Sequence, residues 1–238
     1  ISSWNVSNVT DMSHMFSNAR DFNQPIGDWN VSNVTDMEEM FNFTNSFNQP
    51  IGDWNTSSVT NMKGMFGQAL TFSQPIRNWN VSNVTNMGGM FGGATTFNQT
   101  ISDWDVSSVV YMDGMFAGAI SFNQPIGNWD VSNVTGMEFT FYDAVTYNQN
   151  LSSWNVSNVQ DYRAFDTNTP SWVLPKPFFE PYTFLTKVEL QTAVDLWVSD
   201  NTAALATYGP INTWDVLAIT TMEDLFLNKT TFNSDISN

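Results

Sequence analysis

Tryptophan recurs every 25 residues over the first two thirds of the chain. Valine lies five residues after each of these tryptophans, and in the first six copies methionine follows after eight residues and phenylalanine after twelve. A unit of this length cannot bury its own apolar face, so such repeats fold by stacking on one another. The seven tryptophans are Trp4, Trp29, Trp54, Trp79, Trp104, Trp129 and Trp154.

Two apolar spacings lie within each repeat. Trp29 and Val31 alternate with polar residues, which predicts a short strand with both apolar side chains facing inward. Four further side chains recur at i, i+3, i+4 and i+7 and predict one stripe of a short helix: Met37, Met40, Phe41 and Thr44. Two pairs resemble capping boxes at the start of this helix: Thr35 with Glu38, and Thr135 with Glu138.

These spacings predict an α/β solenoid. We expect a right-handed array of short parallel strands and short helices, with 25 residues per turn, strands on one face and helices on the other.

The order I-x-x-W-x-V-S-x-V resembles the L-x-x-L-x-L core of leucine-rich repeats, with Trp and Val in place of Leu. The longer wording W-[ND]-V-S-N-V-T-x-M-x-x-M-F resembles the BspA-like leucine-rich-repeat surface proteins over residues 1–160 and again over 211–238. The resemblance implies a leucine-rich-repeat-like array that is secreted or displayed on a cell surface. It also implies adhesion or surface interaction rather than catalysis, and it brings no catalytic residues.

The regular pattern ends after Val159, and four prolines follow between Pro170 and Pro181. Proline interrupts both helices and sheets. We expect seven repeats over 1–165 with the last one degenerate, and a Pro- and aromatic-rich capping connector over 166–185. A helical entry cap over 186–210 and the start of a second array over 211–238 should follow. Four aromatic residues should cover the end of the first core: Trp172, Phe178, Phe179 and Tyr182.

The entry cap carries a local helix signal. Thr186 with Glu189 forms a capping box ahead of an apolar stripe. A second short helix is expected over 202–208, because Gly209-Pro210 would end it.

Composition excludes several classes of function. Acidic residues number 23 against 7 basic ones, which gives a net charge of −16 and argues against nucleic acid as a partner. The chain has no apolar run long enough to span a membrane. It has no cysteine and a single histidine, His14. We therefore expect no enzyme, no cofactor and no bound metal.

Polar side chains beside the tryptophans are the predicted binding residues. They would line the outward face of the strands, where they could be solvated surface, a structural ladder of stacked amides, or a contact for glycan, protein or weakly bound calcium. These residues are Asp28, Asn30, Asp53, Asn55, Asn80, Asp103, Asp105 and Asp130. A second asparagine row, in the F-N-Q segments, is expected to satisfy backbone groups of turns.

Asn-x-Ser/Thr sequons are abundant because the repeat contains the text N-V-S-N-V-T. Asn42 and Asn228 stand outside the ladders and are the first candidates for N-glycosylation in a secreted glycoprotein. The next candidates are Asn8, Asn33, Asn83 and Asn133.

The sequence favours a non-enzymatic extracellular or cell-surface scaffold for adhesion, surface coating or fibre assembly. Its partners would be neighbouring copies of itself or other surface proteins and glycans. The last three residues match Ile1-Ser2-Ser3 in repeat phase, so we expect a segment of a longer tandem protein. The alternative is a module that binds glycan or protein through the polar Asn/Asp/Ser face.

Overall fold

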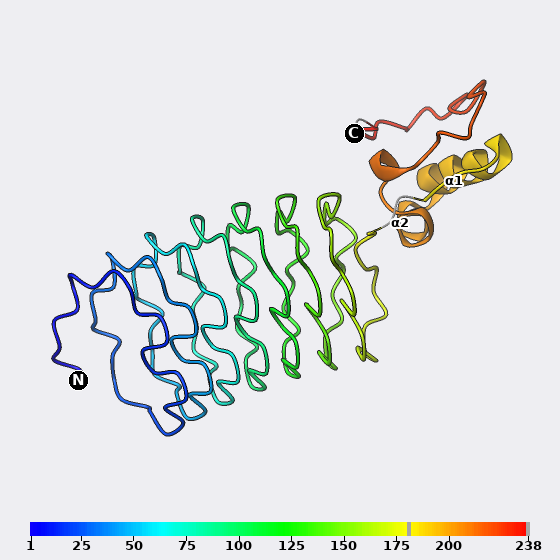
Figure 1. Cartoon of the computed structure of the whole chain (residues 1–238). Coiled ribbons are helices and arrows are strands. Elements are labelled where there is room, and N and C mark those ends of the chain that lie inside the picture. Colours follow the sequence, from blue (N-terminus) through cyan, green and yellow to red (C-terminus); the bar gives the residue numbers. More distant parts are fainter. Residues whose placement is uncertain (180–181, 237–238) are drawn as a thin grey trace.

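The computed structural model describes residues 1–179 and 182–236. Residues 180–181, within the expected connector, and residues 237–238, which carry part of the phase match with Ile1-Ser2-Ser3, lie outside this description. Figure 1 shows the first part of the chain as a row of stacked loops and the later part as a small helical unit. We call each 25-residue period a rung, and number rungs 1 to 7 from the tryptophan that each contains.

Consecutive tight turns build each rung. In rung 2 the Trp29 N–H donates to the carbonyl of Ile26 at 3.1 Å, and the Val34 N–H to that of Val31 at 2.9 Å. The Met40 N–H donates in the same way to the residue three positions before it, at 3.2 Å. Each of these bonds closes a β-turn rather than a helical ring.

Left-handed residues interrupt the segment that was expected to be helical. In rung 2, Glu39 has φ 49° and Phe43 has φ 55°, and each rung of residues 1–179 has such a pair four positions apart. An α-helix needs consecutive right-handed residues, so a left-handed residue at every fourth position stops it. No helix forms in residues 1–179. The predicted repeat helices and their capping boxes, including Thr35 with Glu38, are therefore wrong.

Backbone hydrogen bonds join neighbouring rungs. The Thr60 N–H donates to the Thr35 carbonyl of the preceding rung at 2.9 Å. At four other positions the N–H donates forward to the next rung: Met37 to Asn61 at 3.0 Å, Glu39 to Lys63 at 2.8 Å, Phe41 to Met65 at 2.9 Å and Phe43 to Gly67 at 2.7 Å. Each of rungs 2 to 6 thus satisfies part of the backbone of both neighbours.

The expected parallel sheet is also wrong. Pairing is limited to one residue per rung, in single parallel bridges, and no longer strand forms in the described residues. The bridged row lies after the tryptophan–valine segment, not on it, and runs through Asp11, Asp36, Asn61, Asn86, Tyr111, Gly136 and Asp161. The α/β array of the leucine-rich-repeat type is thus replaced by stacked turns.

The predicted pattern of burial holds although the predicted backbone does not. Trp29 and Val31 are buried, and Asn30 between them is exposed. The indole of Trp54 donates from Nε1 to the Ile26 carbonyl of the preceding rung at 3.2 Å. The tryptophans of rungs 2 to 7 all make this bond to the preceding rung, which gives each buried indole N–H a partner.

Aromatic ladders form one continuous core. Trp54 and Trp79 stack with ring centroids 6.4 Å apart and planes 4° apart. Phe91 stacks on Phe66 at 5.8 Å and on Phe116 at 5.9 Å. At the far end of the array, Trp172 is buried against Tyr147, at 4.7 Å between centroids. Trp172 thus covers the core as expected.

The later part of the chain has its own core. It contains the helices α1 (Lys187–Ser199) and α2 (Asn201–Tyr208) and the short 3-10 helix η1 (Ile211–Thr213). The helix predicted from Thr186 and Glu189 is confirmed, because the Thr186 hydroxyl accepts from the Glu189 N–H. A second apolar cluster packs around these helices and includes Phe184, Leu190, Val194 and Trp214. Tyr182, which was expected to cover the first core, packs against this second cluster instead. None of the described helices is long and apolar enough to cross a membrane.

Candidate functional site

The polar residues predicted for binding are all exposed. Five of them close turns within their own rung instead of forming a ladder between rungs. Oδ1 of Asn55 accepts from the Ser57 N–H at 3.2 Å, and Oδ1 of Asp105 accepts from the Ser107 N–H at 3.1 Å. The same bond occurs at Asn30, Asn80 and Asp130. Either residue type supplies the oxygen that this Asx-turn needs, which explains why Asn and Asp alternate in the row.

The remaining three carboxylates do not converge on a metal. Arg77 forms an ion pair with Asp103 on the surface, while Asp28 and Asp53 are exposed. Within residues 1–179 and 182–236, no group of three or more His, Cys, Asp or Glu side chains lies close enough to hold an ion. Hydrogen bonds from Ser132 lower the pKa of Asp130 below its ordinary value.

Two other asparagine rows carry the contacts between rungs. In the F-N-Q row, Oδ1 of Asn23 accepts from the Asn48 N–H at 3.0 Å, so this row does bond to backbone groups, but those of the next rung. In the second row, Nδ2 of each asparagine donates to a serine carbonyl of the preceding rung. This row includes three sequon residues, Asn33, Asn83 and Asn133.

The other sequons differ in exposure. Asn8 and Asn228 are exposed, whereas Asn42 is only partly accessible. Oδ1 of Asn42 is buried and has no hydrogen-bond partner within the described part of the chain. The glycosylation candidates remain predictions.

A groove crosses rungs 2 to 5 on the segment that was expected to be helical. It encloses about 700 Å³. Small residues form its floor, and larger polar and aromatic residues form its rim. We call it the glycine groove, and its lining residues are Glu39, Asn42, Phe43, Lys63, Gly64, Gly67, Gln68, Asn86, Gly88, Gly89, Gly92, Tyr111, Asp113 and Ala117.

Backbone conformation explains the glycines of the floor. Gly64 has φ 59°, and a Cβ at this position would lie 2.9 Å from Cγ of Glu39. Glycine adopts this left-handed conformation at no steric cost, and the Glu39 side chain takes the space that a Cβ would need. At Gly89, which has φ 63°, a Cβ would meet only the Gly64 backbone at 4.0 Å, so the space there is open. Rungs 2 and 6 place Glu39 and Phe139 at the equivalent left-handed position, so the open floor is confined to the rungs between them.

Two exposed aromatic side chains belong to the rim. Phe43 is 43% exposed and Tyr111 is 50% exposed. Phe43 also has a left-handed φ of 55°, which costs a residue with a Cβ about 1–2 kcal/mol. Every rung has a left-handed residue at this position, and the other six rungs place Asn, Gln, Gly or Asp there. Neither burial nor backbone preference accounts for the phenylalanine of rung 2.

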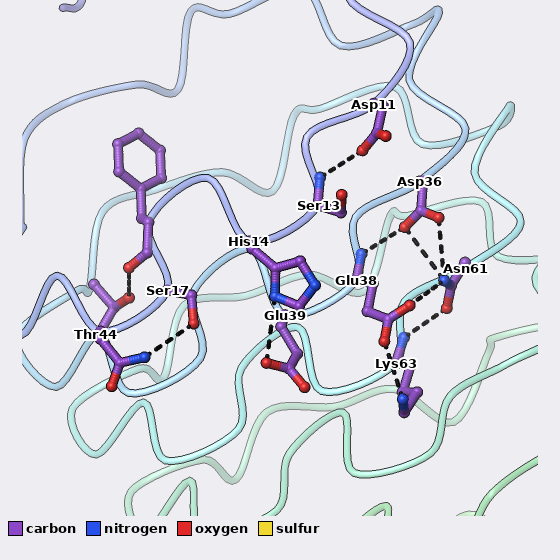
Figure 2. A network of polar contacts seen from close by, with 12 residues as sticks. Asp11, Ser13, His14, Ser17, Asp36, Glu38, Glu39, Thr44, Asn61 and Lys63 are labelled. Atoms are coloured by element: carbon purple, nitrogen blue, oxygen red, sulfur yellow. Dashed lines mark hydrogen bonds and ion pairs between the residues drawn. The ribbon is translucent and has the colours of Figure 1, made fainter.

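A polar network borders the groove (Figure 2). Nζ of Lys63 lies 3.0 Å from Oε1 of Glu38, and Nδ2 of Asn61 donates to the other carboxylate oxygen at 3.0 Å. The bond from Lys63 lowers the pKa of Glu38, and the same bond raises the pKa of Lys63. The one basic side chain that lines the groove is therefore already neutralised by Glu38.

Two acidic side chains also line the groove. Oε2 of Glu39 lies 3.4 Å from Nδ1 of His14, an ion pair only when the histidine is protonated. Oδ1 of Asp113 accepts from the Glu138 N–H at 3.0 Å. One carboxylate thus comes from rung 2 and the other from rung 5, near opposite ends of the groove.

Sequence reasoning missed this groove. The available signal was glycine at Gly64, Gly89 and Gly114, inside segments assigned to helix, where glycine is unfavourable. No local sequence pattern indicates that Phe43 and Tyr111 line the same groove, because this depends on how the rungs stack.

Comparison with known proteins identified one family. A family model described as "Mycoplasma protein of unknown function, DUF285" matches residues 1–92, 71–172 and 196–238. No curated protein matches the chain significantly. No solved structure matches it either.

Proposed function

Because the chain belongs to the family described as "Mycoplasma protein of unknown function, DUF285", whose description assigns no activity, we propose a function from the physical form of the repeat array. The chain is a non-enzymatic repeat scaffold that works outside the cell or at its surface. It serves adhesion, surface coating or assembly by presenting long regular faces to partners. These partners are surface proteins, glycans or further copies of the chain.

The uninterrupted core carries this proposal. The phenylalanine ladder runs through all seven rungs and the buried tryptophans belong to the same core, so the array behaves as one elongated body with repeating side chains on its outside. Repeat proteins of this construction use their extended surfaces for binding. The wording shared with the BspA-like surface proteins supports the same location and role.

Trypsin treatment of intact cells tests the location. Arg163 is 72% exposed and Arg77 is 61% exposed at the side chain, so external trypsin should reach both. Peptides from this chain should be lost from intact cells while a cytosolic marker protein is retained. Full protection of the chain until the cells are lysed would contradict the proposal.

The exposed polar row favours glycan or protein binding as a second function. Five of the predicted residues repeat on one exposed row, where an Asx-turn fixes the direction of each side chain: Asn30, Asn55, Asn80, Asp105 and Asp130. A glycan array screened with the intact chain tests this function. Electron microscopy of the native material tests assembly, because filaments are expected of a fibre and discrete single particles are not.

A further inference from the structure

We propose that the glycine groove binds an extended cationic peptide segment and holds one basic side chain at each end. The inference rests on the proposed scaffold function. It gives that scaffold a class of partner and a binding site other than the polar row. The groove lies on and beside the M-x-x-M-F segments of rungs 2 to 5, and none of the Asx-turn residues of the polar row lines it.

Each end of the groove pairs an exposed aromatic ring with a carboxylate. Rung 2 supplies Phe43 and Glu39, and rung 5 supplies Tyr111 and Asp113. An aromatic face attracts a lysine or arginine side chain, and a carboxylate accepts its hydrogen bonds. The two ends are therefore chemically alike, and both suit a cation.

The distance between the ends suits an extended chain. Three parallel bridges lead from Asp36 in rung 2 through Asn61 and Asn86 to Tyr111 in rung 5. Paired strands lie about 4.8 Å apart, so rungs 2 and 5 are separated by roughly 14 Å along the array. Phe43 lies further along its rung than Asp36, so the long side chains of the basic residues would have to cover the remaining sideways displacement. An extended peptide rises about 3.3 Å per residue, so basic residues at i and i+4 would lie about 13 Å apart.

Charge selects a cation over an anion or a neutral ligand. The chain carries a net charge of −16, and such a field raises the local concentration of cations. The one lysine of the groove is held by Glu38 at 3.0 Å. Glu39 contacts His14 through Oε2 and Asp113 accepts from the Glu138 N–H through Oδ1, so each would meet the ligand through its second carboxylate oxygen. Between the two ends the floor is open at Gly89, where a Cβ would meet only backbone at 4.0 Å, and this gives room for a peptide main chain.

Two phenylalanine variants provide a matched test. Phe43→Gly and Phe139→Gly both replace an exposed phenylalanine with left-handed φ, but of these two side chains only Phe43 lines the groove. The probe is a fluorescent nine-residue Gly/Ser peptide with arginine at i and i+4, titrated into the full chain and followed by anisotropy. A second probe carries its two arginines at i and i+2.

We expect Phe43→Gly to weaken binding of the i,i+4 peptide about tenfold, the size of a single cation–π contact. Phe139→Gly should leave the dissociation constant within about twofold. The i,i+2 peptide should bind the parent chain several-fold more weakly than the i,i+4 peptide. Tyr111→Asn, which introduces the residue found at the same position in rung 4, should weaken binding as Phe43→Gly does.

Several outcomes would overturn the assignment. Equal losses in the two glycine variants, or equal affinity for the two peptide spacings, would mean attraction to the general negative charge. A neutral hexasaccharide that binds with loss in Phe43→Gly, while the peptides do not bind, would make the groove a carbohydrate site. Each of these results leaves the trypsin test of cell-surface location unaffected, so the two proposals fail separately.

Discussion

Truncation of a central phenylalanine tests whether the stacked ladders hold the array together. Phe91 is fully buried and contacts four rings: Phe97 at 3.9 Å, Phe66 at 5.8 Å, Phe116 at 5.9 Å and Trp104 at 6.3 Å. Removing a buried phenylalanine side chain costs about 3–5 kcal/mol, because transfer energy is lost and a cavity is left. We therefore expect Phe91→Ala to lower the free energy of unfolding by about 4 kcal/mol.

The equivalent residue of the first rung gives the comparison. Phe16 is partly exposed and contacts three rings, Phe22, Trp29 and Phe41, since it has no preceding rung. One stacking contact contributes about 0.5–1.5 kcal/mol beyond the area that it buries. Adding the smaller loss of burial, Phe16→Ala should cost about 1–2 kcal/mol less than Phe91→Ala.

Urea unfolding followed by tryptophan fluorescence and circular dichroism measures both values. Phe66→Ala is the matched control, because its ring has the same four kinds of neighbour as Phe91. It should cost as much as Phe91→Ala. Equal costs for Phe16→Ala and Phe91→Ala would refute the reasoning, since stacking between rungs would then contribute nothing measurable.

Three further predictions follow from single features. Tyr147→Phe should stabilise the chain by about 1 kcal/mol in the same urea assay, because the Tyr147 hydroxyl is buried with no partner within the described residues. Burial also raises the pKa of Tyr147. The folded state therefore keeps the proton that the unfolded state releases above about pH 10, so the variant should lose less stability than the parent chain as pH rises beyond that value. Asp130→Asn keeps the Asx-turn acceptor and should leave the stability at pH 7 within about 0.5 kcal/mol of the parent. Because hydrogen bonding lowers the pKa of Asp130, its contribution is present above the unfolded pKa of about 3.9 and lost as pH falls, and urea titrations in acid should find that loss reduced in the variant. Deleting residues 80–104, one whole period, should give a folded chain with an unchanged near-ultraviolet spectrum per rung, whereas deleting 80–103 should shift every later side chain and leave an aggregated product.

The sequence predicted which side chains are buried better than it predicted the backbone. Alternation places Trp29 inside and Asn30 outside whether the chain forms a strand or a pair of turns, so the inference survives the wrong element. The helix predicted from Thr186 was correct because its signal is local and complete. The repeat helices failed because left-handed residues such as Phe43 give no compositional warning.

Glycine, unlike phenylalanine, indicates a left-handed turn from the sequence itself. Gly64 and Gly89 fall in the middle of the expected helical stripe, where they mark left-handed turns. Read together, they would have argued against a helix. The groove needs one more step, because Phe43 and Tyr111 line the same groove only once the four rungs 2 to 5 have stacked.

The hydrogen bonds between rungs have a direction. Four backbone N–H groups of each inner rung point toward the next rung, and a threonine or equivalent N–H points back. The two sides of a rung therefore differ, and either side fits any neighbour that carries the same pattern. Gene segments that encode one period can thus be duplicated or lost by unequal recombination without any new interface having to evolve. The array can therefore change in length by whole periods while the hydrogen bonds between rungs keep the same pattern.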